Sequence, residues 1–127
     1  MSNIVPVLKD EENQSLVPSA WRRTFSEIVE GLKLGDFNRV EQVVGVRQFS
    51  TEDGGRITAN IEAYGAQLTS LPEDTWQTSV CQWMIGYWDV LVDLYTVEEG
   101  ASDLVLAMRV YEKGSAFEFE ILSVYVP

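Results

Sequence analysis

The sequence predicts an α+β fold in which N-terminal helices pack on a curved, four-stranded antiparallel sheet in the C-terminal half of the chain. Three observations lead to this expectation. Apolar residues recur at helical spacing in the first half, and from Trp76 onward the apolar period changes to two. The connections between the later strands are shorter than the roughly dozen residues that a parallel crossover needs. A helical half that covers one face of such a sheet gives two packed layers.

The 127 residues are expected to form a single domain with three parts. Residues 1–16 are rich in charged and amide side chains with little periodicity, which predicts a loosely held arm. Residues 17–70 are expected to be mostly helical, and residues 76–127 to form an antiparallel meander. A chain of this length buries roughly 65 to 70% of its unfolded surface, so it needs no metal or disulfide to fold.

The first helix is predicted over residues 18–34. Its apolar side chains recur every three or four positions, Pro18 suits the first turn, and Gly35 suits a left-handed stop. Asp36 can cap a second, shorter helix that Gly45 would end.

The segment that follows is expected to begin with a short strand, VRQFS at residues 46–50, and a turn, TEDGG at residues 51–55. Residues 56–72 match both a helix and a strand template. We predict a helix because its template runs longer. The sequence from Pro72 onward is typical of a turn or a helix start.

Four β-rich runs complete the chain, at residues 78–84, 88–96, 103–111 and 117–126. Closing the hairpin around VEEGAS so that Val90 faces Met108 also sets Asp89 opposite Arg109. Such a cross-strand charge pair contributes a few tenths to about 1 kcal/mol.

The register of the last strand is open to two interpretations. In a plain register across EKGSA, Glu118 and Glu120 would fall on the apolar face, whereas a one-residue bulge near Gly114 would bring them beside Arg109. We favour the bulge. The outer face would then carry Asp89, Asp93, Glu118, Glu120 and a lone Arg109, with Tyr95 and Tyr111 between them.

The charge of the chain disfavours several classes of partner. Twenty Asp and Glu against nine Lys and Arg give a formal net charge of -11, and no basic cluster exceeds Arg22-Arg23. Direct binding to nucleic acid or to an anionic membrane is therefore not expected, because it needs a basic patch. No apolar run spans a bilayer and no leader is recognised, so a cytoplasmic location is expected. A field of this sign attracts cationic partners.

Catalytic and metal chemistry have little support in the sequence. There is no histidine, which removes the usual serine and cysteine triads and imidazole ligands. The single cysteine, Cys81, lies in an apolar segment and is expected to be a small buried hydrophobe. Asp89 and Asp93 would lie about 13 Å apart along a strand, too far for a carboxylate pair. No cofactor or metal is expected.

An acidic face with interleaved aromatic rings is typical of a protein interface, in which aromatic anchors contribute most of the energy and carboxylates select a basic partner. The alternative is a solvated sheet face and a charged hairpin tip. Trp76, Trp83 and Trp88 with Tyr87 form an aromatic patch, of which one or two tryptophans are expected at the surface. The candidate binding residues are Trp83, Tyr87, Asp93, Tyr95, Glu98, Glu99, Asp103, Glu118 and Glu120.

Two family resemblances add to this interpretation. The order helix, Gly-Asp, helix and curved meander resembles the SnoaL-like cone fold, with LKLGDF matching its Gly-Asp between the first two helices. Pro72, Trp76, Trp83, the WDVLVDL segment, EEGxSDL and the closing VYVP resemble a bacterial family that includes cytoplasmic immunity proteins of contact-dependent growth inhibition systems. This second resemblance covers about the last 57 residues, with weaker support from IEAYGAQL. It implies a protein that binds a toxin domain delivered by a neighbouring cell, many such toxins being nucleases with basic clefts.

The leading hypothesis is therefore a non-enzymatic inhibitor, a monomer in a one-to-one complex with a basic cognate toxin domain. The alternative is a small-ligand-binding protein or isomerase-like enzyme with a cone-shaped pocket, whose base would have to be Asp74 or an inward-facing Glu118. A third hypothesis is a self-associating subunit that uses the aromatic patch as its homodimer surface.

Overall fold

The computed structural model describes residues 4–127. The first three residues of the predicted arm lie outside this range. The elements, in chain order, are β1 (Ser15–Leu16), α1 (Ser19–Leu34), α2 (Phe37–Glu41), α3 (Thr51–Tyr64), the 3-10 helix η1 (Glu73–Gln77), β2 (Val80–Trp83), β3 (Trp88–Thr96), β4 (Gly100–Lys113) and β5 (Ala116–Tyr125).

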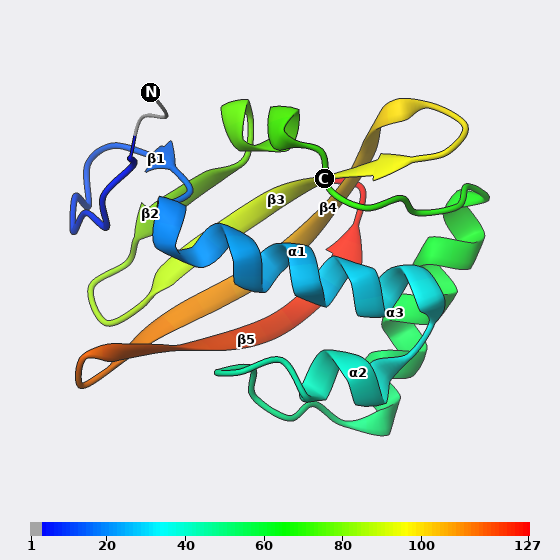
Figure 1. The fold of residues 1–127 in the computed structure, drawn as a ribbon, viewed down its shortest axis with the longest axis horizontal. Helices are drawn as coiled ribbons and strands as arrows, with labels where there is room; N and C mark the ends of the chain where they lie inside the picture. Colours follow the sequence, from blue (N-terminus) through cyan, green and yellow to red (C-terminus); the bar gives the residue numbers. More distant parts are fainter. Residues whose placement is uncertain (1–3) are drawn as a thin grey trace.

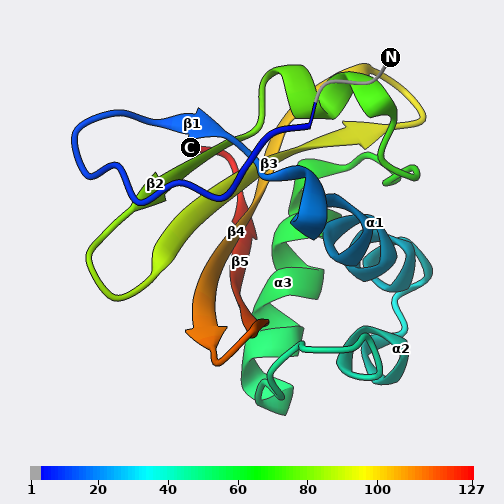
Figure 2. The same ribbon diagram turned by 60° about the vertical axis from the view of Figure 1, so that its left-hand side comes forward.

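The strands form one antiparallel sheet in the order β1-β2-β3-β4-β5, and the helices lie on one side of it (Figures 1 and 2). The α+β class and the antiparallel meander are confirmed. The expected number of four strands is wrong, because Ser15 and Leu16 pair with Cys81 and Val80 as a fifth, edge strand.

The residues before β1 contact the sheet at several points. The Trp88 indole N–H donates to the Leu8 carbonyl at 2.8 Å, and the Gln82 amide donates to the Asp10 carbonyl at 3.1 Å. Lys9 forms an ion pair of 2.7 Å with Glu112. These contacts join the N-terminal segment to β2, β3 and β4.

The core lies between α1 and the inner face of the sheet. Trp21, Phe25 and Ile28 of α1 are fully buried, as the helical spacing of these residues predicts. The Trp21 ring meets the Trp88 and Phe117 rings edge to face, at centroid distances of 5.2 and 5.3 Å. Along β3 the inward residues are buried and the outward ones half-buried, so the period-two pattern of this strand reflects its burial.

The predicted helix boundaries are confirmed where the capping signals are local. α1 ends at Gly35, whose φ of 66° is left-handed, and the Asp36 carboxylate accepts a hydrogen bond from the Arg39 backbone N–H at the start of α2. α2 ends at Glu41, short of the expected stop at Gly45.

The predicted turn TEDGG is wrong, because these residues form the first turns of α3. The Ser50 hydroxyl caps this helix by accepting from the Asp53 N–H at 3.0 Å, and acidic residues in the first turn suit the positive end of the helix dipole. Gly54 is buried against the Phe37 and Phe49 rings, which explains a glycine inside a helix. The helix predicted for residues 56–72 is confirmed as far as Tyr64 and is wrong beyond it, because Gly65, with a left-handed φ of 81°, ends α3 and Leu68 forms an isolated bridge with Thr96.

The predicted strand VRQFS is also wrong. Only Val46 makes a bridge, parallel to Phe119 of β5. Gly45 fits here because of its φ of 86°, and because a Cβ at this position would lie 2.9 Å from the Phe117 carbonyl oxygen. Residues 45–47 thus run close along the outer edge of β5.

The predicted hairpin register is confirmed, with Val90 opposite Met108 and Asp89 opposite Arg109. Glu120 likewise lies opposite Arg109, but not because of a bulge near Gly114. Lys113 pairs with Ala116, so the β4–β5 turn contains only two residues, and the register shift occurs later, at Leu122.

Candidate functional site

The outer face of the sheet, turned away from α1, carries most of the candidate residues. Asp89 and Arg109 form an ion pair across β3 and β4 at 3.2 Å, as the register predicts. On β5, Glu118 and Glu120 are half-buried on this same face, opposite Tyr111 and Arg109. The outer face therefore has the carboxylates that the sequence predicts.

These carboxylates belong to a group of cations, rings and acids near the β4–β5 turn, which we call the arginine cluster: Arg47, Tyr87, Asp89, Arg109, Tyr111, Glu118 and Glu120. Arg47 pairs with Glu118, lies 3.5 Å from a Glu120 carboxylate oxygen, and stacks 4.0 Å from the centroid of the Tyr111 ring. Three carboxylates here face two guanidinium groups, so most of their charge is neutralised.

The second half of the arginine cluster is built around Arg109. Its guanidinium lies 4.6 Å from the centroid of the Tyr87 ring, which in turn lies 5.9 Å from the Tyr111 ring. The Tyr111 hydroxyl donates to Glu120 at 2.9 Å. Burial raises the pKa of Tyr111 the most, and this hydrogen bond raises it further.

Arg47 was missed by the sequence interpretation, which expected Arg109 to be alone. It reaches the outer face because residues 45–47 run along the edge of β5. The Arg47 N–H donates to the Phe119 carbonyl at 2.8 Å, and the Phe119 N–H donates to the Gly45 carbonyl at 2.8 Å. The alternation of carboxylates in FEFE was a signal that a cation was needed, but nothing in the sequence singled out Arg47 as that cation.

The opposite end of the sheet forms a second acidic region, the acidic hairpin end: Glu62, Glu98, Glu99 and Asp103. Glu99 accepts a hydrogen bond of 2.7 Å from the Tyr64 hydroxyl, which itself accepts from the Asp103 N–H at 3.1 Å. Glu98 accepts from the Gln67 N–H at 2.9 Å, and it lines the same surface hollow as Glu62.

The charge of the acidic hairpin end is not neutralised. Within residues 4–127 none of its four carboxylates forms an ion pair with Lys or Arg. Lys33 lines the same hollow, but its ammonium group lies 3.0 Å from Glu30. The hydrogen bond donated to Glu99 raises the pKa of Tyr64.

The remaining candidate residues lie apart from these two regions. Asp93 and Tyr95 are half-buried on β3, and among the described residues the Asp93 carboxylate has no hydrogen-bond partner. Trp83 lies on the inner side of β2, with its ring centroid 4.5 Å from that of Trp88 and Lys9 5.3 Å above it. Trp83 and Tyr87 are therefore on different faces of the sheet.

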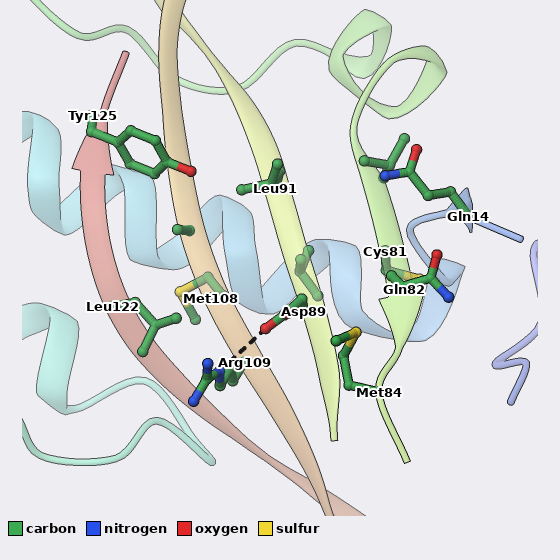
Figure 3. A pocket seen from close by; sticks show the side chains of 13 residues that line it. Gln14, Cys81, Gln82, Met84, Asp89, Leu91, Met108, Arg109, Leu122 and Tyr125 are labelled. Carbon is green, nitrogen blue, oxygen red and sulfur yellow. Dashed lines mark hydrogen bonds and ion pairs between the residues drawn. The ribbon is translucent and has the colours of Figure 1, made fainter. Parts of the chain in front are cut away.

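A groove of about 440 Å³ occupies the middle of the outer face (Figure 3). Its apolar walls come from four strands and include Val80, Leu91, Ala107, Leu122 and Tyr125. Gln82 and the Asp89–Arg109 ion pair also line it. The sequence interpretation missed the groove, because strict alternation along β5 would turn Tyr125 inward, whereas the bulge at Leu122 brings it onto the outer face.

The remaining residues that the sequence analysis discussed can also be placed. Cys81 is buried, as predicted, with its sulfur 3.3 Å from the Ser15 hydroxyl, and burial raises the pKa of its thiol. Asp74 is exposed in η1. Within the part of the chain that the structure describes, no three His, Cys, Asp or Glu side chains are grouped so that they could hold a metal ion. Across the same residues, no helix is both long and apolar enough to cross a bilayer.

Neither a curated protein nor a solved structure matches the chain. One family model matches residues 29–127, from the middle of α1 to the last residue, and so covers the outer face, the arginine cluster and the acidic hairpin end. Because this match extends over well more than half of the chain, the protein belongs to the family described as "Domain of unknown function (DUF7668)".

Proposed function

We propose that the protein is a cytoplasmic, non-enzymatic immunity protein that binds and neutralises a cognate contact-dependent growth inhibition toxin in a one-to-one complex. The observation that carries the proposal is the acidic hairpin end, whose four carboxylates form no ion pair with Lys or Arg in the described chain. Unneutralised surface carboxylates make the local electrostatic potential more negative and speed the encounter with a basic protein.

The distribution of the basic residues supports a protein partner rather than nucleic acid or a membrane. Most basic side chains already pair with carboxylates of the same chain, namely Lys9, Arg23, Lys33, Arg47, Arg56 and Arg109. They are spread over the chain and leave no basic patch of the kind that binds phosphates.

A nuclease is the class of toxin that this surface suits best. A cleft that binds a polyanion is lined with positive groups, and the carboxylates of the acidic hairpin end complement it. The resemblance of the C-terminal strands to immunity proteins of contact-dependent systems supports the same partner. In this role the carboxylates bind through charge, and no bond is made or broken.

The proposal is tested with the C-terminal domain of the protein encoded immediately upstream. We expect the two to co-purify one-to-one and the toxin's activity to be blocked. Asp103→Lys and Glu62→Lys are the best charge reversals, because the carboxylates of Glu98 and Glu99 also hold Gln67 and Tyr64. Together they should slow association by about tenfold and weaken its dependence on salt.

A matched control changes the net charge equally but elsewhere. Glu11→Lys combined with Glu12→Lys alters two exposed residues of the N-terminal segment. We expect this pair to change the association rate by less than about threefold, since long-range charge is screened within roughly 10 Å. Failure of the unmodified protein to bind or inhibit the toxin would refute the proposal.

A small-ligand-binding or isomerase-like role in a SnoaL-like cone is the alternative proposal. It needs an inward-facing acid in a hollow between helices and sheet. Its support is weaker, because Trp21, Phe25 and Ile28 fill the space over the inner face, Glu118 faces outward to Arg47, and Asp74 is exposed. Turnover of a small molecule that is lost in Asp74→Asn would favour it.

A further inference from the structure

The groove in the outer face is shaped to receive a side chain. Leu91 and Ala107 are cross-strand partners, and Leu122 and Tyr125 of β5 stand beside them. Figure 3 shows the Tyr125 ring extending from β5 over β4, on the side of the sheet opposite α1. With 37% of the surface of Leu122 and of Tyr125 exposed, this apolar wall faces solvent.

Along β3, Asp89 lines the groove, and Asp93 lies beyond its lining on the other side of Leu91. Asp89 and Asp93 flank Leu91 on the same face, each about 7 Å from it at the usual rise per residue. Asp89 is paired with Arg109, whereas the Asp93 carboxylate has no hydrogen-bond partner or ion pair among residues 4–127. An apolar floor next to one unpaired acid complements an apolar side chain adjacent to a cation.

The charge of the chain decides between the possible occupants. A second copy would also carry a net charge of -11, so face-to-face association would bring like charges together. A basic partner is attracted by the same field. The side chain of Gln14 and the side-chain oxygen of Gln82, whose NH₂ group already donates to the Asp10 carbonyl, can bond to a peptide backbone without adding charge.

We propose that the outer-face groove is the anchor site for the toxin domain, taking one apolar side chain of a loop whose neighbouring Lys or Arg pairs with Asp93. This inference rests on the proposed function and assigns different steps of binding to two surfaces. The acidic hairpin end speeds association, and the groove, where an apolar anchor loses its contact with water, determines how slowly the complex dissociates.

The test compares groove variants with a matched substitution elsewhere. Ala107→Phe fills the groove from its floor, and Leu122→Ser removes part of its wall without adding bulk. Ala20→Phe is the matched control, because it makes the same Ala-to-Phe substitution at an exposed position of α1. We expect both groove variants to dissociate from the toxin at least about tenfold faster, with association rates within about threefold, and Ala20→Phe to behave like the unmodified protein.

Asp93→Asn tests whether a Lys or Arg of the toxin pairs with the Asp93 carboxylate. Combined with neutral substitutions of toxin Lys and Arg residues, it should show a double-mutant coupling of at least about fivefold with one of them and none with the others. Circular dichroism of each variant establishes that it is folded before binding is measured. If Ala107→Phe does not fold, Leu122→Ser alone tests the groove.

The outcomes separate the inference from the proposed function. If the unmodified protein does not bind the toxin, both are wrong. If it binds but Ala107→Phe and Leu122→Ser dissociate as slowly as Ala20→Phe, the inference alone is wrong. If the mass of the unmodified protein rises with concentration and Ala107→Phe restores the monomer, a second copy occupies the groove and the inference is also overturned.

Discussion

The two ends of the sheet carry similar residues with different consequences. At the β4–β5 turn, the carboxylates of the arginine cluster meet two guanidinium groups and two stacked rings. At the β3–β4 turn, Glu98 accepts from the Gln67 N–H, and Glu99 accepts from the Tyr64 and Thr96 hydroxyls, none of which carries a positive charge. Figure 1 shows the two turns at opposite ends of the sheet.

The difference lies in what the carboxylates remain free to do. A carboxylate paired with arginine and stacked on a ring is part of the fold, and a partner would have to break those contacts to use it. A carboxylate that accepts a hydrogen bond from an amide or a phenol keeps its charge for a partner. Exposed acids are therefore better ranked as binding residues by their neighbours than by their number.

The largest difference between the two ends is expected for glycine substitutions. Gly45→Ala combines a left-handed φ of 86° with a Cβ 2.9 Å from the Phe117 carbonyl, and displaces the segment that carries Arg47. We expect it to lower the free energy of unfolding by about 3 to 4 kcal/mol. Gly100→Ala, at a φ of 73° with open space around it, should lower it by only about 1 to 2 kcal/mol. Urea unfolding measures both, and equal losses would contradict the close packing of residues 45–47 on β5.

The next effect in size concerns Arg47. Arg47→Ala removes two partly exposed ion pairs and a stacked ring, and should lower the free energy of unfolding by about 1 to 2 kcal/mol. Arg47→Lys keeps the charge but not the planar stack, so about half of the loss should remain. The control is Arg39→Ala, an exposed arginine of α2, for which we expect less than about 0.5 kcal/mol. A loss no larger than this control would show that the arginine cluster contributes nothing to stability.

A smaller and more local effect is expected at the acidic hairpin end. Tyr64→Phe removes both the hydrogen bond donated to Glu99 and the acceptor for the Asp103 N–H. We expect the Asp103 amide proton to exchange with solvent about tenfold faster, while Arg109 and its neighbours in mid-sheet are unchanged. Tyr95→Phe is the control, because the Tyr95 hydroxyl makes no hydrogen bond within the described chain. Faster exchange throughout the sheet would mean that the tyrosine supports the whole fold.

The smallest expected effect is on the alkaline titration of two tyrosines, one at each end of the sheet. Tyr111 has its pKa raised by burial and by its bond to Glu120, and Tyr64 by its bond to Glu99. The stabilisation from both is complete below the unfolded value of about 10 and is lost as pH rises through the higher folded values. Phenolate absorbance should therefore show two late-titrating tyrosines, and Glu120→Gln should lower the pKa of only one of them. A change in both would mean that the two ends of the sheet are coupled.

Local signals predicted much of this fold. The helical spacing of apolar residues and the glycine stop predicted α1, and the side-chain cap predicted the start of α2. The strand alternation and the glycine-containing turns predicted the meander and the pairing of Asp89 with Arg109. Where the interpretation was wrong, at β1 and at the start of α3, a short or polar segment gains its structure from a distant partner or from a cap at its first residue.

The amino-acid sequence by itself determined the acidity of the chain, the α+β class and the presence of carboxylates on the outer face, because each depends on composition or on neighbours a few residues apart. Only the tertiary structure decided which carboxylates remain free and where a partner's side chain could enter. Arg47 meets Glu118 across 71 positions of the chain, and the bulge at Leu122 turns Tyr125 to the outer face. Both are products of packing between distant segments, which no local periodicity records.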